Sequence, residues 1–190
     1  MLASLVVHEF SHALVADLLG DHTARLEGRL TLNPLAHLQL VGLLLMLFGP
    51  IGFAKPVPFN PSNLKHRRLG TILVAAAGPF SNFLLALIAL IIWQWVLFDP
   101  YSMLGQIIEL IALVNVSLCL FNLIPIPPLD GSQILRNLFP DSTQKWFYKL
   151  DFYGPFILII LFLIPSVIDN FYIPLINEIV GLLSQAVARL

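Results

Sequence analysis

Two histidines and a glutamate near the start of the chain have the spacing of a metal-binding motif. His8 and His12 are four residues apart, so on a helix both imidazoles lie on one face, with Glu9 about 100° round the axis beside them. Two neutral imidazoles at this spacing can bind one zinc ion, and the adjacent carboxylate reaches a water molecule in an open coordination position. The pattern therefore predicts a catalytic zinc site.

The competing interpretation is a solvated face of a surface helix, where the same pattern occurs by chance. Here the flanking residues are apolar, so three polar side chains would lie in hydrocarbon without partners, at a cost of several kcal/mol each. We therefore favour metal binding. The apolar flank consists of Leu5, Val6, Val7, Phe10, Ala13, Leu14 and Val15.

A third ligand is needed, and Asp130 is the best candidate in the sequence. It follows Pro125, Pro127 and Pro128, which remove backbone donors and force an extended segment, and Gly131 permits a sharp turn just after the carboxylate. Such a break at membrane depth is tolerated only where protein or water surrounds it. From its position alone, Asp130 is more simply explained as a turn residue in water at a helix end.

The composition shows what kind of protein must position these groups. Of 190 residues, 58% are apolar and 11% are charged, and the mean hydropathy is +0.87. A soluble domain is about half apolar and about a quarter charged, so the excess must face lipid. The net charge of -1 gives no indication of nucleic-acid binding. The chain is predicted to be an integral membrane protein, with the lipid bilayer as its surroundings.

The apolar runs predict an all-α polytopic fold with about four to five transmembrane helices in a single domain over residues 1–190. The fifth run is the weakest, because it carries Glu178 and Arg189, and it could lie in the interface instead. The predicted spans are residues 1–19, 71–98, 104–126, 152–168 and 171–190.

Shorter elements are predicted between these spans. Residues 25–32 alternate in polarity before Asn33-Pro34, which is typical of a short interfacial β element and a turn. Residues 40–54 are apolar but too short and too interrupted by glycine and proline to span, so a re-entrant or interfacial segment is expected. Residues 55–68 and 130–151 are predicted to be polar loops, and Asp99-Pro100 a turn.

Basic residues give the expected orientation. Six of the ten Lys and Arg lie between the first two spans and three lie in the second polar loop, so both loops are predicted to be cytoplasmic. The first helix then ends inside the cell, and the metal site lies about 10 Å from the cytoplasmic face. We expect a multi-pass protein of the cell membrane whose active site is nearer the cytoplasm.

Three motifs together resemble the site-2 protease family of intramembrane zinc metalloproteases. They are His8-Glu9-x-x-His12, Gly78-Pro79-x-x-Asn82 and Asn122-x-x-Pro125-x-Pro127-Pro128-Leu129-Asp130-Gly131, in this order and spacing. The stretches Gly20-Asp21-x-x-Ala24-Arg25, Gly28 to Pro34 and Ala54-Lys55-Pro56-Val57 are similar to small bacterial and archaeal members without PDZ or CBS modules. The resemblance covers residues 5–135.

The resemblance implies roles for six residues. His8, His12 and Asp130 would be zinc ligands, Glu9 the general base, and Asn82 and Asn122 would contact the substrate backbone or the oxyanion. It also implies a zinc-dependent endopeptidase whose partner is a transmembrane protein substrate, cut in or near its membrane helix. Such a substrate must unwind locally, and an exposed strand edge at residues 25–32 could pair with it.

Two other functions remain open from the sequence. In a metal-binding membrane protein or transporter, the same three ligands would hold a transported ion, but the external halves of the spans offer few polar residues for a path. A catalytically inactive relative would act as a membrane chaperone, but Glu9 and all three proposed ligands are present. Both alternatives predict that no peptide bond is broken.

Overall fold

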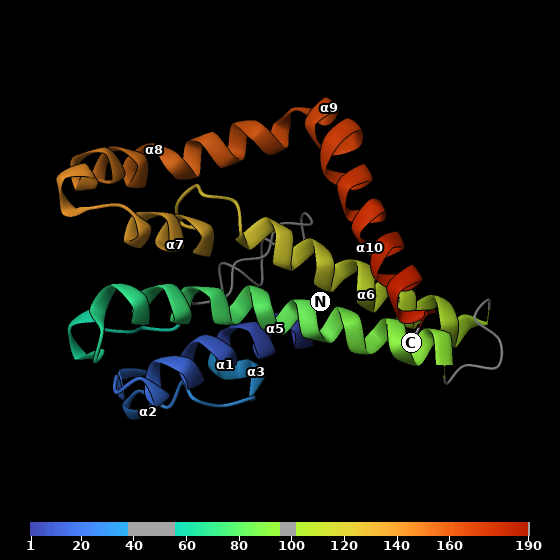
Figure 1. Ribbon diagram of the computed structural model, residues 1–190, viewed down its shortest axis with the longest axis horizontal. Helices are drawn as coiled ribbons and strands as arrows, with labels where there is room; N and C mark the ends of the chain where they lie inside the picture. Colours follow the sequence, from blue (N-terminus) through green and yellow to red (C-terminus); the bar gives the residue numbers. More distant parts are fainter. Residues whose placement is uncertain (38–55, 96–101, 190) are drawn as a thin grey trace. The chain divides into compact units, whose positions relative to one another are not determined.

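The computed structural model describes residues 1–37, 56–95 and 102–189, which form helices joined by turns (Figure 1). No strand occurs in these three ranges, so the all-α prediction is confirmed for them. The chain divides into two compact units, Met1–Ser81 and Asn82–Leu190. The single domain over 1–190 stays a prediction. The predicted re-entrant segment at 40–54 and the Asp99-Pro100 turn lie outside the described residues.

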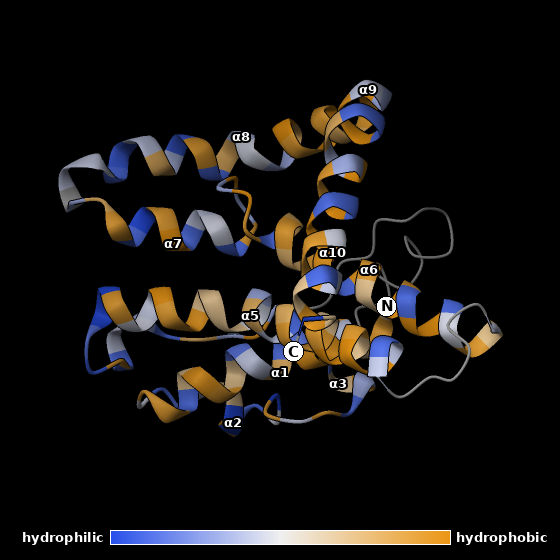
Figure 2. Cartoon of the chain, turned by 45° about the vertical axis from the view of Figure 1, so that its right-hand side comes forward, coloured by the Kyte–Doolittle hydropathy of each residue, from blue (hydrophilic) through white to orange (hydrophobic). Residues whose placement is uncertain are grey.

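Four helical segments of the described chain are long and apolar enough to cross a membrane. They are α5 (Arg67–Trp95), α6 (Met103–Asn122), α8 (Gln144–Leu163) and the segment Pro165–Val187. The last of these contains α9 (Pro165–Val167), a π-helical turn (Ile168–Tyr172) and α10 (Ile173–Val187). Figure 2 shows hydrophobic residues along most of α6 and hydrophilic residues at the start of α8.

In the first unit, α1 (Leu2–Leu18) packs against the first half of α5. Ala16 of α1 and Val74 of α5 are buried together with Leu64. A second cluster joins Ala13 of α1 to Ala24 and Val57. Small residues on α1 therefore allow close packing of the neighbouring segments. The unit also contains α2 (Thr23–Leu26), α3 (Pro34–His37) and a 3₁₀ turn (Pro61–Asn63).

Asp21 ties the end of α1 to the segment that precedes α5. Its buried carboxylate accepts hydrogen bonds from the Asn60 N–H at 2.5 Å, the Asn63 amide at 2.8 Å and the Thr23 hydroxyl at 2.5 Å. Burial by itself would raise the pKa of Asp21, but these hydrogen bonds outweigh it and the pKa is lower than usual. The ionised carboxylate is therefore the form that the fold stabilises.

The β element predicted at residues 25–32 is not present. Residues 23–26 form α2, and the chain then reverses at Gly28, which has a φ of +66°. The Arg29 N–H donates to the Ala24 carbonyl at 2.7 Å, so a local turn satisfies the backbone where a strand would need a partner. The alternation of polar and apolar residues does not correspond to burial here, since Leu26 and Leu32 are exposed whereas Arg29 is buried.

In the second unit, α5, α6 and α10 share one core. All but one of its buried residues are alanine or β-branched, and the alanines let the helices approach closely. Tyr172 links α6 to the π-helical turn, since its hydroxyl donates to the Ser117 carbonyl at 2.8 Å. The core residues are Ala86, Ala89, Leu90, Ala112, Val116, Ile176, Val180 and Val187.

Helix bounds in this unit differ from the predicted ranges for local reasons. α8 begins at Gln144, before the start of the predicted span at residue 152. Its first turns are helical but polar, and a hydropathy criterion detects only the apolar turns that follow. The helix ends at Leu163, since Pro165 keeps Ile164 extended (φ -92°, ψ 103°). The polar loop predicted at 130–151 is instead largely helical: it contains α7 (Asp130–Leu138) as well as the start of α8.

Candidate metal centre

His8 and His12 lie side by side within the first unit. Both are buried, and their Nε2 atoms are 3.0 Å apart with the rings edge to face. Two histidine nitrogens on a tetrahedral zinc ion, each about 2.0–2.1 Å from the metal, would be about 3.3 Å apart. The pair predicted from the one-turn spacing is therefore present with its Nε2 atoms close to the separation that zinc requires.

A backbone carbonyl of α5 fixes the orientation of the second histidine. His12 Nδ1 is 2.7 Å from the Val74 carbonyl oxygen. Because a carbonyl only accepts, Nδ1 carries the proton, and Nε2 is the nitrogen that can bind a metal. Metal-ligating histidines usually hold their second ring nitrogen in this way. This contact cannot be read from the sequence, since Val74 is 62 residues away and contributes only a backbone group.

Gly78 lets α5 approach the two imidazoles. A Cβ at this position would overlap with Nε2 of His12 and would lie 2.6 Å from Cε1 of both rings. Only glycine fits this cradle, so the space beside the ring nitrogens depends on it. In the sequence, Gly78-Pro79 stood out only as part of the motif that ends at Asn82. The contact with the histidines is a packing role that sequence reasoning missed.

Glu9 is held by a segment far away in the sequence. Its Oε2 accepts a hydrogen bond from the Val57 N–H at 3.1 Å. Val57 lies between Pro56 and Pro58, which have no N–H, so its amide is the single donor in this extended tripeptide. Val57 is also buried in the cluster with Ala13. A rigid backbone donor therefore fixes one carboxylate oxygen of Glu9.

The donor set of the first unit fits a zinc ion. It offers two buried imidazoles with converging Nε2 atoms, one of them oriented by a carbonyl. Beside them lies a half-buried carboxylate. Catalytic zinc sites typically combine histidine nitrogen ligands with a nearby carboxylate that does not bind the metal.

Asp130 belongs to the second unit, where it is the first residue of α7 and is half-buried. The reversal from α6 into α7 is tight, since a Cβ at Gly131 would overlap with the Leu123 carbonyl and lie 2.6 Å from the Ile124 oxygen. This close approach is the reason for the glycine after the carboxylate. The role of Asp130 as third ligand stays a prediction.

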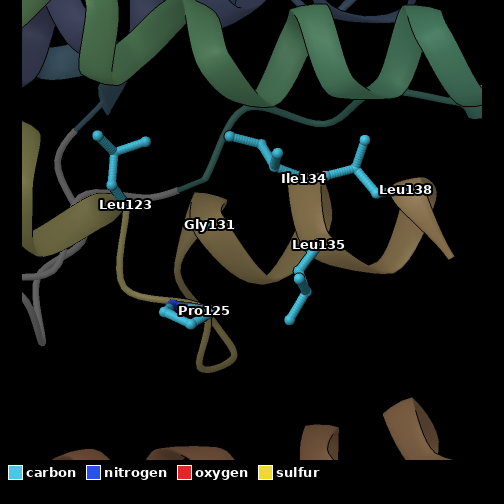
Figure 3. A pocket seen from close by; sticks show the side chains of 6 residues that line it. All are labelled: Leu123, Pro125, Gly131, Ile134, Leu135 and Leu138. Atoms are coloured by element: carbon cyan, nitrogen blue, oxygen red, sulfur yellow. The ribbon is translucent and has the colours of Figure 1, made fainter.

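An apolar cavity of about 210 Å³ lies beside this turn (Figure 3). Its walls come from the end of α6, the proline segment and α7, and they carry only apolar side chains or glycine. The lining residues are Leu123, Pro125, Gly131, Ile134, Leu135 and Leu138.

The two asparagines singled out in the sequence make contacts inside the second unit. The side-chain Nδ2 of Asn115 donates to the Ile111 carbonyl at 2.8 Å, because a carbonyl oxygen can only accept. The Oδ1 of Asn115 therefore faces Asn82 and accepts a hydrogen bond from the Nδ2 of Asn82 at 2.9 Å. Both amide orientations are thereby fixed. Asn122 donates to the Leu118 carbonyl at 2.9 Å. Substrate contact by Asn82 and Asn122 stays a prediction, and sequence reasoning missed Asn115.

Comparison with known proteins finds a matching family model and several similar proteins. The model of peptidase family M50 matches residues 100–163. The candidate zinc metalloprotease YwhC of Bacillus subtilis is 38% identical over 174 residues, which make up 87% of this chain and 78% of that protein.

More distant relatives have similar names. The candidate zinc metalloprotease Rip2 of Mycobacterium tuberculosis is 33% identical over 177 residues, covering 90% of this chain and 68% of that protein. The zinc metalloprotease MJ0392 of Methanocaldococcus jannaschii is 26% identical over 138 residues, covering 73% of this chain and 32% of that protein. No solved structure matches the chain.

Proposed function

Because the chain belongs to peptidase family M50, the family of the site-2 proteases, we propose that it cuts a peptide bond in or near a transmembrane helix of another membrane protein. The chain is a zinc-dependent metalloprotease, and its four long apolar helices make it a multi-pass membrane protein. The observation that carries the proposal is the buried His8–His12 pair beside a Glu9 carboxylate held by a backbone amide.

His8 and His12 hold the zinc ion through Nε2, and Asp130 supplies the third ligand. The tautomer of His12 supports its role, since the Val74 carbonyl keeps the proton on Nδ1. For Asp130 the support is its carboxylate chemistry, its place in the family motif and the tight turn at Gly131 that presents it at the start of α7. An aspartate oxygen completes a three-residue set that leaves one position open, as catalytic zinc sites require.

Glu9 is the general base. Its Oε2 accepts the Val57 N–H, so Oε1 is the oxygen that takes a proton from the attacking water. Bound zinc supplies Lewis acidity, which polarises the scissile carbonyl and lowers the pKa of water toward about 7. As the water oxygen bonds to the carbonyl carbon and the C–N bond breaks, Glu9 passes the proton to the leaving nitrogen.

The substrate must be unwound where it is cut, because helical hydrogen bonds shield its peptide groups. Residues 25–32 form no strand edge for it to pair with. Asn82 and Asn122 remain the proposed contacts for the substrate backbone or the oxyanion. The apolar cavity beside Asp130 suits an apolar substrate side chain.

The active site lies nearer the cytoplasmic face. Support comes from the positive-inside rule, since Lys65, Arg67 and Arg68 precede or begin α5. His12 is six residues before the end of α1 at Leu18, about 9 Å along the helix axis. The path that water must take from the cytoplasm to the site is therefore short.

The Glu9→Gln variant tests the chemistry. In proteoliposomes with a transmembrane substrate, cleavage should fall by about 10²- to 10⁴-fold, because the amide cannot take a proton. Zinc per chain, measured by mass spectrometry, should stay near the parent value. Glu27→Gln serves as the matched control, since Glu27 is exposed and outside the site. Cleavage by Glu9→Gln near the parent rate would refute the general-base role.

The Asp130→Asn variant tests the ligand set. It should lower zinc content sharply, since the loss of one of three ligands removes much of the binding free energy. Asp169→Asn is the control, because Asp169 is an exposed aspartate at another helix. Full zinc content in Asp130→Asn would require a different third ligand.

A further inference from the structure

A second cavity, of about 320 Å³, lies in the second unit between α5, α6 and α10. One face of each helix lines it, as the spacing shows: Leu90 and Trp93 are one turn apart on α5, and Glu109 and Leu113 one turn apart on α6. From α10 come Asn177, Val180, Gly181 and Ser184, spaced at three, four and seven residues. The cavity belongs to no part of the proposed active site.

Its walls combine apolar and polar groups. Leu90, Leu113 and Val180 are hydrocarbon, whereas Asn177 and Ser184 offer donors and acceptors. The Nε1–H of Trp93 is buried, and no described residue accepts its hydrogen bond. A buried donor of this kind is costly, so an acceptor supplied by a ligand would be stabilising.

Glu109 gives the cavity its charge. It is an exposed carboxylate within a membrane helix, and it forms no ion pair with the described part of the chain. Ionisable groups in membrane helices are costly and pair with a partner where one is available. The missing partner of Glu109 is therefore a cation. Glu178 on α10 is also exposed but does not line the cavity, so it provides a matched control carboxylate.

The cavity lies close to the ends of its helices. Trp93 is two residues from the end of α5, Ser184 three residues from the end of α10, and Glu109 six residues from the start of α6. Trp95 hydrogen-bonds the Val187 carbonyl at 3.1 Å at the same end. Tryptophans of this kind mark the level of the lipid headgroups.

We propose that this cavity binds the headgroup of an ethanolamine phospholipid. The ammonium donates hydrogen bonds to Glu109, and the phosphate oxygens accept from the Trp93 indole, from Ser184 and from Asn177. The acyl chains lie on the exposed apolar surface of Leu110. A choline headgroup has no ammonium N–H to donate, and a glycerol headgroup has no cation to pair with Glu109.

Gly181 makes the proposal testable without harming the fold. A Cβ at this position would have no atom within 4 Å, so the cavity has room for a side chain there. Gly181→Leu should fill the space and exclude the headgroup. Ala186→Leu is its control, because Ala186 is exposed on the same helix and does not line the cavity.

The experiment measures binding of dioleoyl phosphatidylethanolamine, phosphatidylcholine and phosphatidylglycerol to the detergent-solubilised protein by native mass spectrometry. The parent should bind the ethanolamine lipid most tightly. Glu109→Gln should weaken that binding about ten-fold and remove the preference over choline lipid, since a charge-assisted hydrogen bond is lost. Glu178→Gln should behave like the parent. Circular dichroism of each variant checks the fold.

Three results would overturn the proposal. Equal binding of the three lipids by the parent would show that the headgroup is not recognised. Unchanged ethanolamine-lipid binding by a folded Gly181→Leu variant would place the lipid elsewhere. Soluble phosphoethanolamine binding as tightly as the lipid would assign the cavity to a soluble ligand.

Discussion

The Gly78→Ala substitution adds one methyl group beside the proposed zinc ligands. The new Cβ would overlap with Nε2 of His12 and lie 2.6 Å from Cε1 of His8, about 0.8 Å short of the 3.4 Å at which ordinary contact begins. Because the obstructing atoms belong to buried rings and not to flexible side-chain ends, α1 or the rings must move by about that distance. Metal–ligand distances in a well-formed site lie within about 0.2 Å of their usual values, so a shift of this size would distort the site.

The expected result is a loss of zinc and of activity. Overpacking should cost about 1–3 kcal/mol of stability, and a 1 Å displacement of catalytic groups about 10²-fold in rate. Zinc per chain, cleavage of a transmembrane substrate and thermal unfolding in detergent measure the three effects. Gly181→Ala is the control, since its Cβ meets nothing and alanine favours a helix. A Gly78→Ala protein with full zinc content and the parent cleavage rate would refute the packing argument.

Three further substitutions test other contacts. Val57→Pro removes the N–H that holds Glu9 while keeping an extended backbone, so cleavage should fall about ten-fold with zinc retained; an unchanged rate would show that the hydrogen bond is dispensable. The folded pKa of Asp21 is lower than its unfolded value, so its stabilising effect is complete above about pH 4 and is lost as the pH falls through the folded pKa. The melting temperature of the parent should therefore drop more between pH 7 and pH 3 than that of Asp21→Asn, and equal drops would contradict the assignment. Asn115→Leu removes the acceptor of Asn82 and should lower the free energy of unfolding by about 1–3 kcal/mol, measured by thermal denaturation; a change below about 0.5 kcal/mol would mean that the amide pair contributes little.

The differences between prediction and structure have local causes. Hydropathy placed the boundary between the last two spans at Asp169-Asn170, but the break occurs at Ile164, where the following proline forbids helical geometry. The polar pair instead lies inside a π-helical turn. Hydropathy is averaged over a window of residues, so it does not detect a helix break that a single proline causes. The absent strand at 25–32 has a similar cause, since alternation alone cannot show whether a pairing partner exists.

The sequence by itself determined the membrane character, the helical class and the pairing of His8 with His12, because composition and a one-turn spacing depend only on neighbouring residues. Only the tertiary structure decided how the pair and its base are held. The Val57 amide that orients Glu9 comes from 48 residues away, and the Val74 carbonyl that sets the tautomer of His12 from 62 residues away. Both are backbone groups, which every residue carries, so no side-chain pattern could reveal which of them the fold would bring to the site.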